Sequence, residues 1–174
     1  MKKYILFFVL TMPFIANGAS IGLTNGSSKF FYGGGLGASF GDVDTVTLSP
    51  LAGINVNDKT SVGLQFSYVY RKDSRGQRDV TTNDYATTLF TRYHLTSQFF
   101  LEADAEHLNN EFVRTDASTG RRTFNSFLAG GGIRTPIGGN ASVFVSVLYN
   151  FSYDKENSPY SDPISISGGI GVGF

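Results

Sequence analysis

Apolar and polar residues alternate with a period of two in eight separate segments of this 174-residue chain. Successive side chains of a β-strand point to opposite faces, so this period predicts strands with one apolar and one polar face. The clearest segment is the last, where Ile164, Ile166, Ile170 and Val172 alternate with serine and glycine. The eight segments lie near residues 29–40, 45–54, 61–70, 84–95, 99–107, 123–135, 141–151 and 163–174. No amphipathic helix of useful length is present, so an all-β fold is predicted.

The first 18 residues, MKKYILFFVLTMPFIANG, have the organisation of a secretory signal peptide. Lys2 and Lys3 precede an apolar stretch of about a dozen residues, which is too short for a stable membrane span. Small residues follow it and place the cut before Ala19, with a cut before Ser20 as the alternative. We therefore expect export, with an N-terminal anchor as the competing interpretation, and a single domain over residues 19–174.

The connections between the segments are alternately short and long after the first one. Short connections lie at 41–44, 55–60, 96–98 and 136–140, and long polar ones at 71–83, 108–122 and 152–162. Tyrosine and phenylalanine gather at the strand ends, as in the aromatic girdles of membrane barrels. The pattern predicts an eight-stranded antiparallel up-and-down transmembrane β-barrel, with the N-terminus on the side of the short turns. A soluble β-sandwich shares the strand spacing and is the alternative.

Composition excludes several classes of protein. The chain has no cysteine, so it has no disulfide scaffold, no cysteine-bound metal and no thiol catalysis. Its 14 basic residues balance its 14 acidic residues, which argues against binding to nucleic acid. No cofactor or metal site is predicted.

The C-terminus resembles a known signal. The ending Ile166-x-Gly168-x-Ile170-x-Val172-x-Phe174 is similar to the C-terminal assembly signal of bacterial outer-membrane proteins, carried here by Ile170, Val172 and Phe174. Together with the signal peptide and the eight segments, residues 20–174 resemble the small OmpA-like/OmpX-like outer-membrane barrel superfamily. The resemblance implies an integral protein of a Gram-negative outer membrane, surrounded by its lipids and lipopolysaccharide and inserted by the barrel assembly machinery. It is nearly uninformative about activity.

The interior of an eight-stranded barrel is just wide enough to be filled by side chains. The short turn at 96–98 is expected to place Arg92 opposite Glu102 and Phe90 opposite Asp104, with Arg134 beside Glu102 on its other side. A structural ion network that fills the barrel is the leading interpretation, and a gate, a proton path or a ligand contact is the alternative. The predicted lumen network is Arg92, Glu102, Asp104, Glu106 and Arg134. Glycines at 33, 35, 37, 130, 132, 169, 171 and 173 are expected to face the lumen, making room for side chains or leaving a slot for an apolar ligand.

Two of the predicted loops are rich in arginine. Arginine suits bidentate contact with phosphate, and the outer leaflet around such a barrel is phosphorylated. Lipopolysaccharide or a protein partner is therefore a candidate ligand, while solvated loops remain the alternative. The candidate contacts are Arg71, Lys72, Arg75, Arg78, Arg114, Arg121 and Arg122.

No catalytic residue is predicted. The chain has two histidines, His94 and His107, and no serine lies within two residues of either. The leading expectation is a non-enzymatic barrel with an envelope structural or surface-interaction role. A narrow channel or carrier for small or apolar molecules and a lipid A-modifying enzyme are the alternatives.

Overall fold

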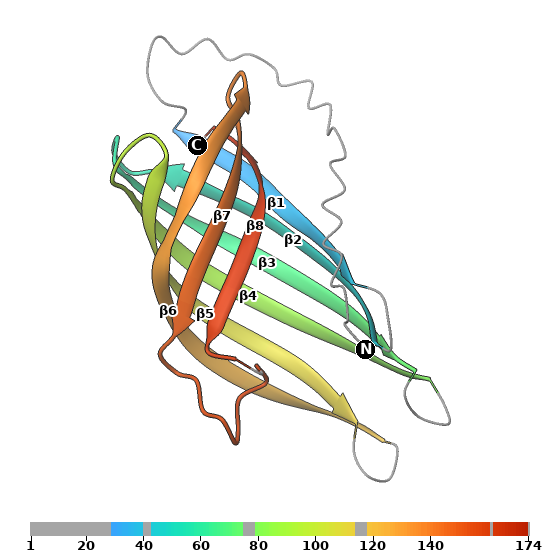
Figure 1. The fold of residues 1–174 in the computed structure, drawn as a ribbon. Helices are drawn as coiled ribbons and strands as arrows, with labels where there is room; N and C mark the ends of the chain where they lie inside the picture. Colours follow the sequence, from blue (N-terminus) through green and yellow to red (C-terminus); the bar gives the residue numbers. More distant parts are fainter. Residues whose placement is uncertain (1–28, 40–42, 75–78, 114–117, 161, 174) are drawn as a thin grey trace, which may run out of the picture.

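The computed structural model describes residues 29–39, 43–74, 79–113, 118–160 and 162–173. Their strands pair in chain order, each antiparallel to the next, and close into a barrel (Figure 1). The strands are β1 (Phe30–Ser39), β2 (Val43–Asn55), β3 (Thr60–Asp73), β4 (Val80–His94), β5 (Phe99–Val113), β6 (Thr119–Gly138), β7 (Ala141–Asn150) and β8 (Ile164–Val172). The predicted eight-stranded antiparallel barrel is confirmed, while the signal segment 1–18 and the cut at Ala19 or Ser20 lie outside the described residues.

The two faces of each strand differ as the alternation predicted. On β4, Leu89 and Tyr93 point outward and are 51% and 46% exposed, whereas Phe90 and Arg92 point into the lumen and are 2% and 3% exposed. The outer surface is therefore apolar and the interior holds a charge. No helix in the described part of the chain is both long and apolar enough to cross a membrane.

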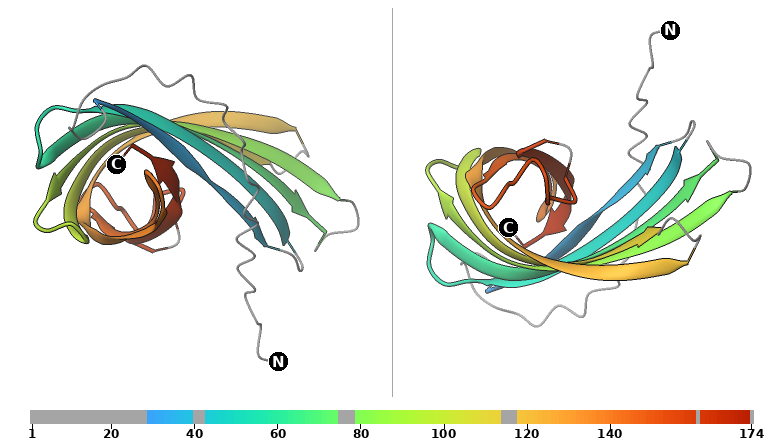
Figure 2. Two further views of the ribbon diagram at one scale, coloured as in Figure 1. Left: turned by 90° about the horizontal axis from the view of Figure 1, so that it is seen from above. Right: turned by 90° about the horizontal axis from the view of Figure 1, so that it is seen from below.

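Glycine allows the barrel to close between its first and last strands. The pairing runs from Tyr32 opposite Val172 to Gly34 opposite Ile170. A Cβ added to Gly33 would lie 2.3 Å from the carbonyl oxygen of Ile170, so no larger residue fits this close approach of two backbones. Figure 1 shows β1 and β8 meeting near the C-terminus and separating along their length. Figure 2 shows β1 to β5 and the first half of β6 fanning outward beyond the rounded part.

Two predicted long loops are wrong. β3 continues to Asp73 and pairs there with Val80 of β4, and β5 continues to Val113 and pairs there with Thr119 of β6. The segments 71–83 and 108–122 are therefore mostly extended hairpins. Backbone hydrogen bonds continue between the strands where both faces of the sheet are polar. The strands are therefore longer than the segments in which apolar and polar residues alternate. The third predicted loop, between β7 and β8, is a real connection.

The short turn between β6 and β7 requires glycine. Gly138 and Gly139 have φ angles of 135° and 56°, a region that residues with a Cβ rarely adopt. A register shift between Pro136 and Gly138 accompanies this turn. Because the chain reverses direction at this turn, the glycines of β6 lie against β7.

Candidate functional site

The centre of the lumen contains the predicted pair Arg92 and Glu102. The two residues lie directly opposite one another in the β4–β5 ladder, and Phe90 lies opposite Asp104, as predicted. Arg92 Nε donates a hydrogen bond to Glu102 Oε2, and the two residues are 3% and 5% exposed. The ion pair is thus removed from solvent, where it is favourable only when its remaining hydrogen-bonding groups are also paired.

Three aromatic rings surround the guanidinium. Its Cζ lies 4.8 Å from the ring centroid of Phe90, 5.0 Å from that of Phe100 and 4.4 Å from that of Phe144. Cation–π attraction is strongest when the cation is desolvated, as here. These rings belong to one buried cluster, whose members are Phe31, Leu51, Phe90, Phe100 and Phe144. Aromatic rings from β1, β4, β5 and β7 therefore fill the lumen around one arginine.

The second oxygen of Glu102 bonds to β7 rather than to Arg134. Ser146 Oγ donates to Glu102 Oε1 over 3.2 Å and lies 2.9 Å from Ser167 Oγ of β8. Arg134 lies further toward the turn, because Gly130 is the residue opposite Glu102 in β6. The guanidinium of Arg134 donates instead to the carbonyl oxygen of Ser97 over 3.0 Å. The prediction that Arg134 flanks Glu102 is therefore wrong, since Arg134 lies four positions along β6 from Gly130, the residue opposite Glu102.

The lumen glycines serve two spatial roles. A Cβ on Gly132 would lie 2.4 Å from the Phe100 ring, and one on Gly169 would lie 3.0 Å from the Phe144 ring. These glycines make room for side chains, as expected. Gly33, Gly35 and Gly130 accommodate a neighbouring backbone, because a Cβ on each would lie within 2.6 Å of a carbonyl oxygen, and the same is true of Gly132 and Gly169.

Beside the ion pair lies a small polar cavity. Its volume is about 60 Å³, and Asp104 and Glu106 line it together with Gln65, Thr88, Ser165 and Ser167. Asp104 Oδ1 is buried without a hydrogen-bond partner among the described residues. Sites for small-molecule ligands usually measure about 300–1,000 Å³, so this cavity is too small for one.

The connection between β7 and β8, here called the strap, crosses the lumen on the loop side. Tyr160, in the connection between β7 and β8, donates its hydroxyl proton to the carboxylate of Glu106 on β5. Burial, followed by the charge of Glu106, raises the pKa of the Tyr160 hydroxyl above its ordinary value. The base of this connection is also tied, because the Phe127 amide donates to Ser152 Oγ over 3.1 Å. The connection is therefore attached to β6 at its base and to β5 through Tyr160.

A second buried polar cluster, which the sequence did not predict, lies further toward the loops. Asp84 of β4 accepts hydrogen bonds from Arg71 Nη2, from Asn110 Nδ2 and from the amide of Glu111, at 3.0, 3.0 and 2.9 Å. Asp84 is 4% exposed. The cluster joins β3, β4 and β5. The alternation of faces in β3 and β4 could have indicated this cluster. When it is continued along both strands toward the loop, it places Arg71 and Asp84 on the lumen side.

The candidate loop contacts do not form one surface. Arg71 is engaged with Asp84 on the lumen side, and Lys72 Nζ pairs with Asp79 Oδ2 over 2.7 Å on the outer side. The hydrogen bond from Lys72 lowers the pKa of Asp79. Arg122 shares the lumen-side face with Asn110. The positions of Arg75, Arg78 and Arg114 lie outside the described residues.

Arg121 is the remaining outward candidate with a described position. Its Nη1 donates to Asn109 Oδ1 over 2.8 Å, and its Cζ lies 5.2 Å from the Tyr85 ring centroid. Glu111 Oε2 lies 3.5 Å from Arg121 Nη2. The outward-facing Phe127 lies further down β6 and is 63% exposed. A positioned cation therefore borders the apolar outer surface.

A serine and a histidine meet at the turn side, although they are distant in sequence. Ser61 Oγ lies 3.2 Å from His94 Nε2 and donates to Asn55 Oδ1 over 2.7 Å. Asn55 Nδ2 donates to the carbonyl oxygen of Gly173, which fixes the orientation of the amide. The single hydroxyl proton of Ser61 is thus given to Asn55, so His94 must supply the proton in the Ser61–His94 contact. This is the reverse of a base that activates a nucleophile.

The assembly-signal residues lie at the barrel seam. Ile170 pairs with Gly34 of β1 and Val143 of β7, and Val172 pairs with Tyr32 and Ala141. Phe174 lies outside the described residues. Within the described ranges, no group of three or more histidine, aspartate and glutamate side chains could hold a metal ion.

No protein-family model and no curated protein matches this sequence.

Proposed function

We propose that this chain is an integral outer-membrane β-barrel with an envelope structural or surface-interaction role and without catalytic activity. The observation that carries the proposal is the inverted distribution of polarity. Leu64, Leu101 and Val147 on the outer surface are 56%, 50% and 49% exposed, while Arg92 and Glu102 are buried inside. A continuous apolar exterior is unfavourable in water and favourable in hydrocarbon, where closed pairing satisfies the backbone.

The filled lumen favours a structural role over a narrow channel or carrier. The aromatic cluster around Arg92 contains rings from four strands, and Tyr160 lies over the polar cavity on the loop side. The slot for an apolar ligand along the glycine wall gains no support, because the Phe100 and Phe144 rings occupy the space beside Gly132 and Gly169.

The direction of the hydrogen bonds at the one serine–histidine contact among the described residues argues against a lipid A-modifying enzyme. Ser61 is 1% exposed, and its proton is directed to Asn55. A nucleophile must reach its substrate and pass its proton to a base, and Ser61 satisfies neither condition.

Surface interaction centres on Arg121 in this proposal. An arginine held at the border of the apolar surface is placed to contact a phosphate of lipopolysaccharide in the outer leaflet. The barrel assembly machinery is the partner proposed for insertion, through the C-terminal strand.

Cell fractionation tests the proposal. After expression in a Gram-negative host, we expect the protein in the outer-membrane fraction, resistant to alkaline extraction and migrating faster on gels before boiling than after it. Zero conductance in planar bilayers and an unchanged lipid A mass spectrum would support the non-channel, non-enzymatic role. Recovery as a soluble periplasmic protein with no change in mobility on boiling would contradict membrane integration.

A further inference from the structure

The outer face of β4, β5 and β6 changes from apolar to polar at the same row of the sheet in all three strands. Leu89 and Phe127 lie on either side of Ala105 in this sheet, face outward and are 51% and 63% exposed. The next outward row toward the loops consists of polar side chains, those of Thr87, His107 and Asn125. Polar side chains are unfavourable in hydrocarbon, so the headgroup region of a membrane would begin at this row.

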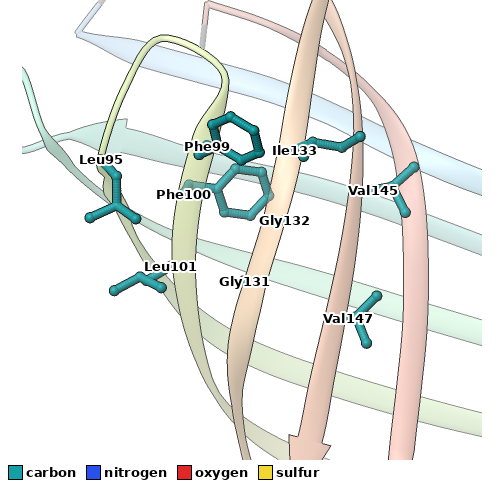
Figure 3. Close-up of a pocket in the computed structure, with 9 residues that line it drawn as sticks. All are labelled: Leu95, Phe99, Phe100, Leu101, Gly131, Gly132, Ile133, Val145 and Val147. Carbon is teal, nitrogen blue, oxygen red and sulfur yellow. The ribbon is translucent and has the colours of Figure 1, made fainter.

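Nearer the turns the same face of the sheet is apolar. Figure 3 shows Gly131 and Gly132 of β6 between apolar side chains of β5 on one side and β7 on the other. A groove with a volume of about 510 Å³ runs over Gly131. Phe99 and Leu101 line it and are 52% and 50% exposed. The polar row is therefore continuous with an apolar surface, which suits a ligand with a polar headgroup and apolar chains.

Two side chains of the polar row are paired with one another. His107 Nδ1 lies 2.7 Å from Asn125 Oδ1. A carbonyl oxygen only accepts, so the imidazole donates here, and the neutral imidazole then has an acceptor at Nε2. The amide nitrogen of Asn125 supplies two donors. Neither side chain has another hydrogen-bond partner in the described ranges. The pair offers donors and an acceptor together, as a sugar hydroxyl group requires, because a hydroxyl both donates and accepts.

Arg121 is held beside this pair. Its Nη1 donates to Asn109 Oδ1 over 2.8 Å. Asn109 follows His107 by two residues on the same face of β5, so their backbone positions are about 7 Å apart. Glu111 Oε2 lies 3.5 Å from Arg121 Nη2 and also accepts a hydrogen bond from the amide of Asn83. The Arg121 side chain is 41% exposed and that of Glu111 15%, so the positive charge is the more accessible of the two.

We propose that this patch, formed by His107, Asn109, Arg121 and Asn125, binds the phosphorylated sugar headgroup of lipopolysaccharide. A phosphate lies at Arg121, and hydroxyl groups of the sugar ring bond to His107 and Asn125. The inference rests on the proposed function and extends it from the phosphate to the sugar. A phosphate alone only accepts hydrogen bonds, so it would engage Arg121 and leave the acceptor of His107 unused. The acyl chains of the same molecule lie on the apolar surface past Phe127.

The test measures which lipids the folded protein retains. The barrel is refolded in mild detergent with one of three probes, diluted, and analysed by native mass spectrometry. The probes are lipid A with both phosphates, lipid A from which both phosphates have been removed, and phosphatidic acid, which carries a phosphate without a sugar. Asn125→Ala removes the sugar contact, and Arg121→Gln removes the phosphate contact. Asn140→Ala removes an exposed asparagine side chain in the turn between β6 and β7 and is the matched control.

The two variants should respond to different parts of the probe. Asn125→Ala should lower retention of both forms of lipid A about fivefold and leave retention of phosphatidic acid unchanged. Arg121→Gln should lower retention of phosphorylated lipid A and of phosphatidic acid, and should leave retention of the dephosphorylated form unchanged. Asn140→Ala should match the wild-type protein with all three probes.

Equal retention of lipid A by Asn125→Ala and the wild-type protein would overturn the inference. An equal loss of phosphatidic acid in Asn125→Ala would also overturn it, because the pair would then not select the sugar. So would a wild-type dimer that Asn125→Ala dissociates, since a second copy would then cover the patch. Insertion into vesicles and mobility on unboiled gels are measured in parallel. Insertion with an effect of Arg121→Gln but none of Asn125→Ala contradicts this inference alone, whereas failure to insert contradicts the proposed function.

Discussion

Arg92 and Glu102 face one another across the β4–β5 hairpin and form an ion pair that is buried in the lumen. Ser146 bonds to the second carboxylate oxygen, and aromatic rings cover the guanidinium. The serine hydroxyl and the aromatic rings thus suit the charges of the pair. Removal of one partner should therefore be far more costly than removal of both.

Arg92→Met should lower the free energy of unfolding by about 3–5 kcal/mol, because Glu102 is then buried without its cation. The double variant Arg92→Met/Glu102→Leu should lose less than about 2 kcal/mol, since no isolated charge remains. Urea unfolding in lipid vesicles, followed by gel mobility, measures both, because the chain has no tryptophan for fluorescence. Equal losses in the single and double variants would contradict this expectation, because removal of Glu102 would then recover no stability.

The ring of Phe144 lies closer to the Arg92 guanidinium than the rings of Phe90 and Phe100. Phe144→Leu should cost about 2 kcal/mol more in the wild-type background than in the Arg92→Met background, because the cation–π attraction exists only in the first. The same unfolding assay provides the double-mutant cycle. A coupling near zero would mean that Phe144 acts only by filling space.

Tyr160 should remain protonated above its ordinary pKa of about 10, because burial raises its pKa in the folded protein. Because folding raises the pKa of Tyr160, its contact with Glu106 stabilises the folded protein fully below a pH of about 10. This stabilisation is lost progressively as the pH rises above that value. The tyrosinate absorbance of the folded wild-type protein minus that of Tyr160→Phe should show no ionisation near pH of about 10. In denaturant the same difference should titrate there. Titration near that pH in the folded protein would show that the strap is open.

Arg121 and Arg122 are adjacent in sequence but lie on opposite faces of β6. Arg121→Gln should weaken binding of lipopolysaccharide by about 1 kcal/mol, roughly fivefold, because Arg121 lies on the outer face. Arg122→Gln is the matched control and should leave binding unchanged, since its guanidinium lies 5.0 Å from the Phe112 ring on the lumen-side face. Surface plasmon resonance with immobilised lipopolysaccharide compares the two. Equal effects would indicate general electrostatic attraction rather than a site.

The strands and the Arg92–Glu102 pairing could be predicted because both follow from local rules. Period-two alternation assigns each side chain to a face, and a short turn sets the register of the hairpin that it closes. The same rules failed for Arg134, because the register between β5 and β6 is set around a long hairpin whose strands continue into polar sequence. The contact between Arg71 and Asp84 was missed because β3 and β4 also continue into polar sequence.

Contacts between distant segments could not be predicted. Ser61 and His94 meet because β3 and β4 are neighbours, and Tyr160 meets Glu106 because a connection folds over the lumen. Neither contact leaves a periodic signal in the sequence. The groove over Gly131 was likewise invisible, because it depends on how closely β6 approaches β5 and β7.

The most direct test of the account is the environment of successive residues along β3. The chain contains no cysteine, so single cysteines at positions 64, 65, 66 and 67 can each carry one fluorescent label. In vesicles, a quencher dissolved in the lipid chains should reach labels replacing Leu64 and Phe66, which point outward, and should not reach those replacing Gln65 and Ser67. Quenching that does not alternate, or a water-soluble quencher that reaches positions 64 and 66, would contradict a barrel whose apolar exterior lies in a membrane.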